Sequence, residues 1–192
     1  MLNRKLCIFV LAFSTTSISH AEIEPLLTVG LEVGGDDLVT TTTTDLKAGG
    51  GITFGAGASI SPNDSSISFR VVMHYLFDTV EFTSPDGEAE TDSFPLELAI
   101  FNSWDRHEMG AGITSHLNSS YEICFDSGGC SEADLDSSTG IFLQYNYIFS
   151  RAETASMTTD TYIGLKVRTM DYEIGNTTLD ANSVGFYLGS KF

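Results

Sequence analysis

The chain has 192 residues, with nine Lys and Arg against 26 Asp and Glu and a formal net charge of −17. Nucleic-acid binding needs clustered basic side chains against phosphates, so a chain this acidic is not expected to bind nucleic acid. After the first residues, no stretch reaches the roughly 18 unbroken apolar residues of a membrane helix.

Residues 1–21 are predicted to be a secretory signal peptide. Arg4 and Lys5 form a short basic start, "LCIFVLAF" is a brief apolar core, and "STTSISHA" ends in small residues. The alternative, a buried first strand, lacks the expected alternation. Cleavage after Ala21 removes two basic residues and no acidic one, so the net charge of −17 becomes −19. Residues 22–192 are then expected to form one domain.

Extended segments with alternating apolar and polar residues follow along the rest of the chain, and no amphipathic helix interrupts them. The eight segments are predicted at 26–34, 47–60, 66–79, 93–103, 107–118, 138–150, 156–170 and 181–192. Most reach the roughly 9–11 residues that a tilted strand needs to cross a bilayer. The stretch "LVTTTTTDLKAGGG" predicts an extension of the first two strands beyond the membrane, because Thr favours strands.

The connections between segments alternate in length. Those after the second, fourth and sixth segments are short, whereas the other four are longer and polar. Taken as 34–46, 78–93, 118–136 and 171–180, the long connections hold 17 Asp and Glu and no Lys or Arg. An up-and-down barrel places odd and even connections on opposite sides of the membrane, so this alternation favours such a barrel.

Charged and small residues share one face of the segments. In the third segment, for example, Arg70 and His74 alternate with Phe69, Val71 and Met73. The interior of an eight-stranded barrel is only wide enough for its own side chains, so this face is predicted to plug the lumen with ion pairs and water. The predicted interior network comprises Glu32, Lys47, Arg70, His74, Glu97, Glu108, Lys166, Arg168 and Lys191.

Alternation alone does not tell which face points outward, and a soluble lipocalin-like barrel would turn the apolar face inward. Aromatic residues decide for the membrane, because they gather on apolar faces near the short connections, where a girdle at the lipid interface is expected. These residues are Phe69, Trp104, Tyr145, Tyr147, Phe149 and Phe192.

The last segment, "SVGFYLGSKF", ends on an aromatic residue. Its Val184, Phe186, Leu188 and Phe192 resemble the C-terminal signature of bacterial outer-membrane β-barrels, from which Ser190 departs by placing a polar residue in an apolar slot. Together with the other features, this resembles the small OmpA-type and OmpX-type barrels. The implied fold is an all-β, eight-stranded antiparallel up-and-down transmembrane β-barrel. The implied location is the outer membrane of a Gram-negative cell envelope, in contact with outer-membrane lipid, lipopolysaccharide and the barrel-assembly machinery.

Two cysteines remain after cleavage, Cys124 and Cys130, on either side of "FDSGG". An even pair across a short Gly-rich loop of an exported chain predicts a disulfide. Metal binding and free thiols are the alternatives, but the spacing lacks the paired pattern and the histidines of a zinc site.

The sequence predicts a structural or surface-interaction role through the acidic extracellular loops. The simplest interpretation of their charge is a solvated surface that resists aggregation. A sharper hypothesis is that carboxylates share Ca²⁺ or Mg²⁺ with lipopolysaccharide phosphates, since hard oxygen ligands suit these cations. The carboxylates considered are Asp36, Asp37, Asp86, Glu88, Glu90 and Asp92.

Other functions are open at this point. Lipid A acyl-modifying enzymes exist on this architecture, and His116 lies near Ser115, Ser119 and Glu122. However, "SHLNSSYE" does not match the His-x-Ser-Asn stretch of the outer-membrane enzyme that removes acyl chains from lipid A. An OmpW-like passage for small apolar molecules would use a loosened wall near the Gly-rich second segment or Pro95. Adhesion through the loops is the remaining class. The sequence predicts neither a catalytic centre nor a cofactor.

Overall fold

A computed structural model describes residues 21–40, 45–62, 65–83, 86–126, 128–136, 138–154, 158–174 and 177–192. Within these ranges, no helix is long and apolar enough to cross a membrane. Residues 1–20 of the predicted signal peptide lie outside the described ranges, and Ala21 is the first residue of strand β1.

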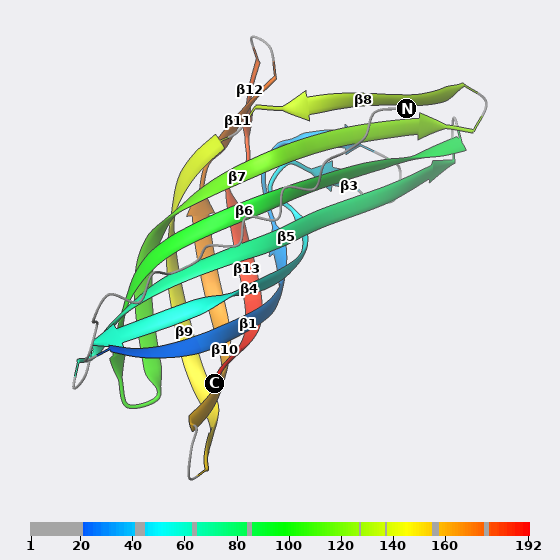
Figure 1. Cartoon of the computed structure of the whole chain (residues 1–192). Helices are drawn as coiled ribbons and strands as arrows, with labels where there is room; N and C mark the ends of the chain where they lie inside the picture. The colour runs from blue at the N-terminus through cyan, green and yellow to red at the C-terminus, as the bar shows by residue number, and fades with distance from the viewer. Residues whose placement is uncertain are drawn as a thin grey trace, which may run out of the picture.

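Eight long strands form one closed antiparallel barrel (Figure 1). They are β1 (Ala21–Val33), β4 (Gly51–Pro62), β5 (Ile67–Thr83), β6 (Asp86–Trp104), β7 (His107–Phe125), β9 (Ser138–Glu153), β10 (Thr158–Thr169) and β13 (Ser183–Lys191). Each pairs with the next along the chain, and β13 pairs with β1 to close the ring. The predicted all-β, up-and-down eight-stranded barrel is therefore confirmed.

Shorter strands lie at the end of the barrel where the long connections are (Figure 1). They are β2 (Asp37–Thr40), β3 (Asp45–Lys47), β8 (Gly129–Leu135), β11 (Asp171–Ile174) and β12 (Thr177–Asp180). Strands β2 and β3 form one hairpin and β11 and β12 another, while β8 adds to the extended end of β7. The second and third long connections are thus largely continuations of β5, β6 and β7, and not the polar loops that the sequence indicated.

The Thr-rich segment does not extend β1 and β4. Its described residues pair with each other in the β2–β3 hairpin, and residues 41–44 lie outside the described ranges. The chain leaves β1 through Gly34 and Gly35, which have φ values of 137° and 87°. A side chain on Gly35 would place its Cβ 2.5 Å from the backbone nitrogen of Gly49. These two glycines therefore turn the hairpin away from the barrel wall.

Pro95 interrupts the ladder between β5 and β6 without opening it. The pairs Met73–Leu96 and Leu76–Ser93 flank the interruption and keep the same register. Proline has no N–H to donate, which accounts for the local loss of pairing. The barrel wall is continuous at this point, so the structure gives no support to a lateral passage here.

The β6–β7 ladder carries a bulge where the sheet leaves the barrel. Between the pairs Asp92–Ser120 and Phe94–Leu117, strand β7 has one extra residue. Within this stretch Asn118 has φ 50°, in the left-handed region that Asn tolerates better than most residues. A bulge increases local twist and bends the strand, so this one sets the direction of the extended sheet.

This geometry makes Asn118 sensitive to side-chain shape. Asn118→Val should lower the free energy of unfolding by about 1–2 kcal/mol, because a β-branched residue is strained at positive φ. Asn118→Gly should cost little or slightly stabilise. Urea unfolding in lipid vesicles measures both. Equal effects of the two substitutions would contradict a strained backbone at this position.

Candidate functional site

Side chains that point away from the lumen form a continuous apolar belt. On β10, for example, Ile163, Leu165 and Val167 are 53%, 41% and 52% exposed. A soluble protein rarely leaves an apolar surface this large in water, so the belt faces lipid. We treat the part of each long strand that carries the belt as membrane-spanning.

Aromatic side chains gather at the short-turn end of the belt. Trp104, Tyr145 and Tyr147 are exposed, and all three surround His107, whose ring centroid lies 5.5–5.9 Å from theirs. The Tyr145 hydroxyl lies 2.6 Å from His107 Nδ1. Rings with an apolar body and a polar tip suit the lipid–water interface, as the sequence indicated for this end.

Glu97 is at the centre of the lumen and is almost fully buried. Lys166 Nζ donates to both of its carboxylate oxygens at 2.7 Å, and His74 Nε2 lies 3.2 Å from Oε2. The Lys166 ammonium also lies 4.2 Å from the ring centroid of Tyr187. A buried carboxylate needs such partners, because an unpaired charge in a confined interior is costly.

Glu108 is the centre of a second group, nearer the short turns. Arg70 forms an ion pair with it at 2.7 Å, Lys191 Nζ donates at 2.9 Å, and Asn146 Nδ2 donates at 3.0 Å. The Arg70 guanidinium lies 3.9 Å above the ring centroid of Phe101, a cation–π contact.

Glu32 is the centre of the third group, nearer the long connections. Arg168 forms an ion pair with it at 2.6 Å, Ser183 donates a hydrogen bond at 2.8 Å, and the Tyr187 hydroxyl donates another. These partners come from β10 and β13, so one carboxylate links three neighbouring strands.

Lys47 does not belong to these groups, so its predicted place in the interior network is wrong. Its side chain is 38% exposed and pairs with Asp37 in the β2–β3 hairpin outside the barrel. The hydrogen bond to Asp37 is the main cause of the raised pKa of Lys47. The other eight predicted interior residues all point into the lumen.

Little space remains among these side chains. A cavity of about 20 Å³ lies between Arg70, His74, Glu97, Gln144 and Tyr187. This volume accommodates about one water molecule, and the polar lining offers it hydrogen-bond partners.

An apolar cluster covers the lumen at the end with the long connections. It consists of Ala48, Leu135, Met170, Tyr172 and Ala181, all buried and drawn from three of the long connections. Burial raises the pKa of Tyr172, whose hydroxyl is hydrogen-bonded to His116 Nδ1 at the top of the lumen. Three long connections thus pack together as a cap.

The extended ends of β5, β6, β7 and β8 form a sheet beyond the belt (Figure 1). One face of this sheet carries carboxylates in directly opposed pairs: Glu81 faces Glu88, and Glu90 faces Glu122, which in turn faces Glu132. We call these five residues the acidic sheet face. Partial burial and then repulsion by Glu122 and Glu88 raise the pKa of Glu90.

The other face of the same sheet is apolar. Val80 and Ala89 pack there against Leu46 of the β2–β3 hairpin, with Phe82 and Ile123 beside them. This packing holds the extended sheet against a second element, so its carboxylates are presented on a supported surface and not on a loose loop.

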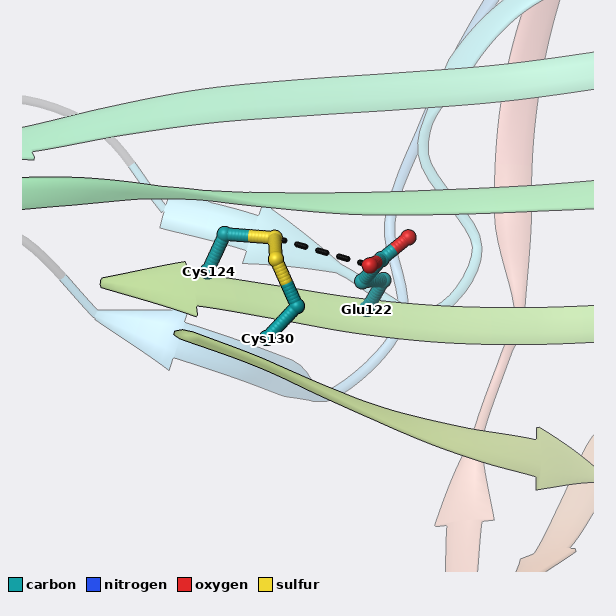
Figure 2. The surroundings of a disulfide bond; sticks show 3 residues. All are labelled: Glu122, Cys124 and Cys130. Atoms are coloured by element: carbon teal, nitrogen blue, oxygen red, sulfur yellow. Dashed lines mark hydrogen bonds between the residues drawn. A yellow bond between two sulfur atoms is a disulfide. The ribbon is translucent and has the colours of Figure 1, made fainter. Parts of the chain in front are cut away.

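The predicted disulfide between Cys124 and Cys130 is confirmed. The two residues are directly opposed in the β7–β8 ladder and their sulfurs are bonded (Figure 2). Glu122 lies 3.5 Å from Cys124 Sγ. Glu122 and the two sulfurs are close enough together to resemble a metal site. Disulfide sulfurs lack the thiolate charge that binds metals, so these three residues are not interpreted as a metal site. The disulfide cross-links the β7–β8 hairpin.

The carboxylates considered for divalent cations fall into two sets, Asp36 and Asp37 on the first long connection and the other four on β6. Asp37 pairs with Lys47, Asp36 Oδ2 accepts a hydrogen bond from the backbone of Asp180, and Asp92 accepts one from Ser120. Asp86, Glu88 and Glu90 lie between the start of β6 and Asp92.

His116 is not arranged as a catalytic base. Its Nε2 accepts a hydrogen bond from Arg168 at 3.0 Å, so Nδ1 carries the proton and faces the hydroxyls of Tyr172 and Ser93. A serine triad requires an acid on the nitrogen opposite the serine, whereas here that nitrogen faces a cation. His116 and Ser93 are also almost completely buried.

The predicted interior network leaves out several buried polar and aromatic residues, among them Gln144, Asn146, Tyr162 and Tyr187. Their signal was present, because Gln144 and Asn146 alternate with the outward Tyr145 and its neighbours. The predicted network contains only charged residues and one histidine, whereas neutral polar and aromatic side chains complete it.

No protein-family model matches the chain, and no curated protein matches it in sequence. Solved structures do match. The attachment invasion locus protein Ail of Yersinia pestis, in complex with the heparin analogue sucrose octasulfate, has a TM-score of 0.56 and 5% identity over 90% of this chain and 97% of its own. Neisserial surface protein A has a TM-score of 0.52 and 14% identity over 89% and 97%.

Both matched proteins are small eight-stranded barrels, and at these identities the likeness concerns the fold. With the closed sheet and the apolar belt, it defines the class: the chain is an eight-stranded transmembrane β-barrel of the OmpA/OmpX-like type. Barrels of this class belong to the outer membrane.

The Glu108 group provides a test of the interior ion pairs. Glu108→Gln should lower the free energy of unfolding by about 3–5 kcal/mol, because it leaves Arg70 and Lys191 buried without their shared carboxylate. Glu22→Gln, on an exposed position of β1, should change it by no more than about 0.5 kcal/mol. Urea titrations of both variants in vesicles give the values. A loss below 1 kcal/mol for Glu108→Gln would show that water screens this group.

Proposed function

We propose that the chain is a non-enzymatic outer-membrane barrel that contacts partners outside the cell through its acidic extracellular end. The acidic sheet face is the observation that supports this proposal. Its carboxylates lie on a sheet supported from behind by the β2–β3 hairpin and cross-linked at its tip by the disulfide. A rigid surface of one charge favours partners of the opposite charge.

The expected partners are cationic. Ail was solved with a polyanion, sucrose octasulfate. The long connections of this chain hold 17 Asp and Glu and, apart from Lys47 at the edge of the first, no Lys or Arg, so a polyanion would be repelled. Basic peptides or basic protein surfaces fit the charge. Divalent cations shared with lipopolysaccharide phosphates are a weaker proposal, because Asp36, Asp37 and Asp92 already have partners within the chain.

The lumen has a structural role in this proposal. The three carboxylate groups and the apolar cap fill the barrel, so solutes are not expected to pass. The barrel-assembly machinery is the expected partner during insertion, since β13 carries Val184, Phe186 and Leu188 outward and forms the closing seam with β1.

Charge neutralisation on the acidic sheet face tests the surface role. The triple variant Glu88→Gln, Glu90→Gln and Glu122→Gln in nanodiscs should bind decalysine about tenfold more weakly at low salt, with the difference shrinking at high salt because screening shortens the range of the charges. Surface plasmon resonance measures the dissociation constants.

The matched control neutralises three exposed carboxylates elsewhere on the extracellular end: Asp126→Asn, Asp171→Asn and Glu173→Gln. It removes the same charge and should weaken binding much less. Equal losses in the two triple variants would mean that net charge alone attracts the peptide, and the sheet face would then have no special role.

Conductance tests the plugged lumen. The purified barrel in planar lipid bilayers should give no large, steady channels, because the interior of an eight-stranded barrel is filled by its own side chains. Single-channel recording at several voltages makes the measurement. Stable openings of porin size would refute the proposal.

A further inference from the structure

The lipid-facing surface of the barrel is hollowed over five neighbouring strands, β4, β1, β13, β10 and β9. The hollow has a volume of about 670 Å³. Outward side chains of the apolar belt line it, together with Gly30, Gly164 and Tyr187. The side chains are Val29, Leu31, Ile52, Tyr145, Tyr147, Ile163, Leu165, Phe186 and Leu188.

Three glycines of the strands that form the hollow face the lumen. A Cβ on Gly30 would lie 2.6 Å from the ring of Tyr187, and one on Gly189 would lie 2.2 Å from the ring of Tyr162. A Cβ on Gly164 would lie 2.5 Å from Asn146 Oδ1. The wall approaches the interior side chains closely only because these positions lack side chains. Gly30 and Gly164 are also among the residues that line the hollow on the lipid-facing side.

The occupant of the hollow must be apolar, because the hollow lies within the belt and its lining offers almost only carbon atoms. A second copy of the chain is a poor occupant. A twofold dimer brings the same patch of each subunit together, and two concave patches cannot fill each other. A flexible hydrocarbon chain can follow the hollow and cover its side chains. The volume also lies within the roughly 300–1,000 Å³ of small-molecule sites.

We propose that this hollow is a binding site for an acyl chain of a phospholipid, with the headgroup toward the short turns. Tyr145 and Tyr147 line the hollow at that end, and His107 contacts both rings. Their polar tips lie at the depth of a lipid headgroup. Since the short turns of such barrels face the periplasm, the lipid belongs to the inner leaflet of the outer membrane.

Lipid retention tests the site. The barrel extracted in mild detergent should keep one phospholipid through repeated detergent washes, counted by native mass spectrometry. The double variant Val29→Trp and Leu165→Trp fills the hollow and should reduce the retained phospholipid by about tenfold. Leu98→Trp, on the belt of β6 outside the hollow, is the matched control and should retain the lipid.

Three outcomes would overturn the proposal: a native barrel that keeps no phospholipid, a double variant that keeps as much as the native barrel, or a control that loses as much as the double variant. If the double variant does not fold, the native protein provides a second test. Trp104, the only tryptophan, lies against His107 at the headgroup end. A phospholipid brominated near the headgroup should quench its fluorescence saturably at about one lipid per barrel, whereas quenching that never saturates would reject the site.

Discussion

Hydrocarbon offers no partner to a backbone N–H or C=O, so every strand in the membrane must pair on both edges. The chain meets this constraint by pairing β13 with β1, which leaves the eight-stranded wall without an edge. The other features of the fold follow. In an up-and-down barrel, successive connections lie on opposite sides of the membrane. Each strand has lipid on one face and a narrow lumen on the other, so apolar and polar side chains must alternate along it.

The narrow lumen then requires that every buried charge be paired, because an unpaired charge in a confined interior is costly. Glu32, Glu97 and Glu108 each have cationic partners from other strands, and tyrosine and phenylalanine rings occupy the space between them. This packing makes the barrel a rigid support. In the function proposed here, contacts with other molecules are made by two surfaces, the acidic sheet face and the lipid-facing wall.

Alternation predicted most of this from sequence, because a period of two assigns each residue of an uninterrupted strand to one face. Arg70, Glu97 and Lys166 were assigned correctly for this reason. Lys47 was not, because the glycines after it turn the chain and the parity of β4 cannot be carried back through Gly51, which has φ 131°. The acidic stretch of β6 predicts a loop from sequence, because Asp and Glu are depleted in strands. Ala89 of this stretch and its partner Val80 on β5 carry the alternation that marks it as a strand.

The lipid-facing hollow lay beyond sequence reasoning for a different reason. The glycines of the wall were visible, but their effect depends on the rings of Tyr162 and Tyr187, which approach them only in the closed barrel.

The carboxylate of Glu32 has a consequence for the order of assembly. Its hydrogen-bond partners Ser183 and Tyr187 are 151 and 155 residues away along the chain, and its cation, Arg168, is on β10. Until β10 and β13 have joined the sheet, Glu32 lacks these three partners. An incomplete ring that entered the membrane would then expose an unpaired carboxylate to hydrocarbon. Glu32 stabilises the closed barrel but makes insertion of an open sheet into the membrane unfavourable. Closure of the barrel and its insertion are therefore thermodynamically coupled.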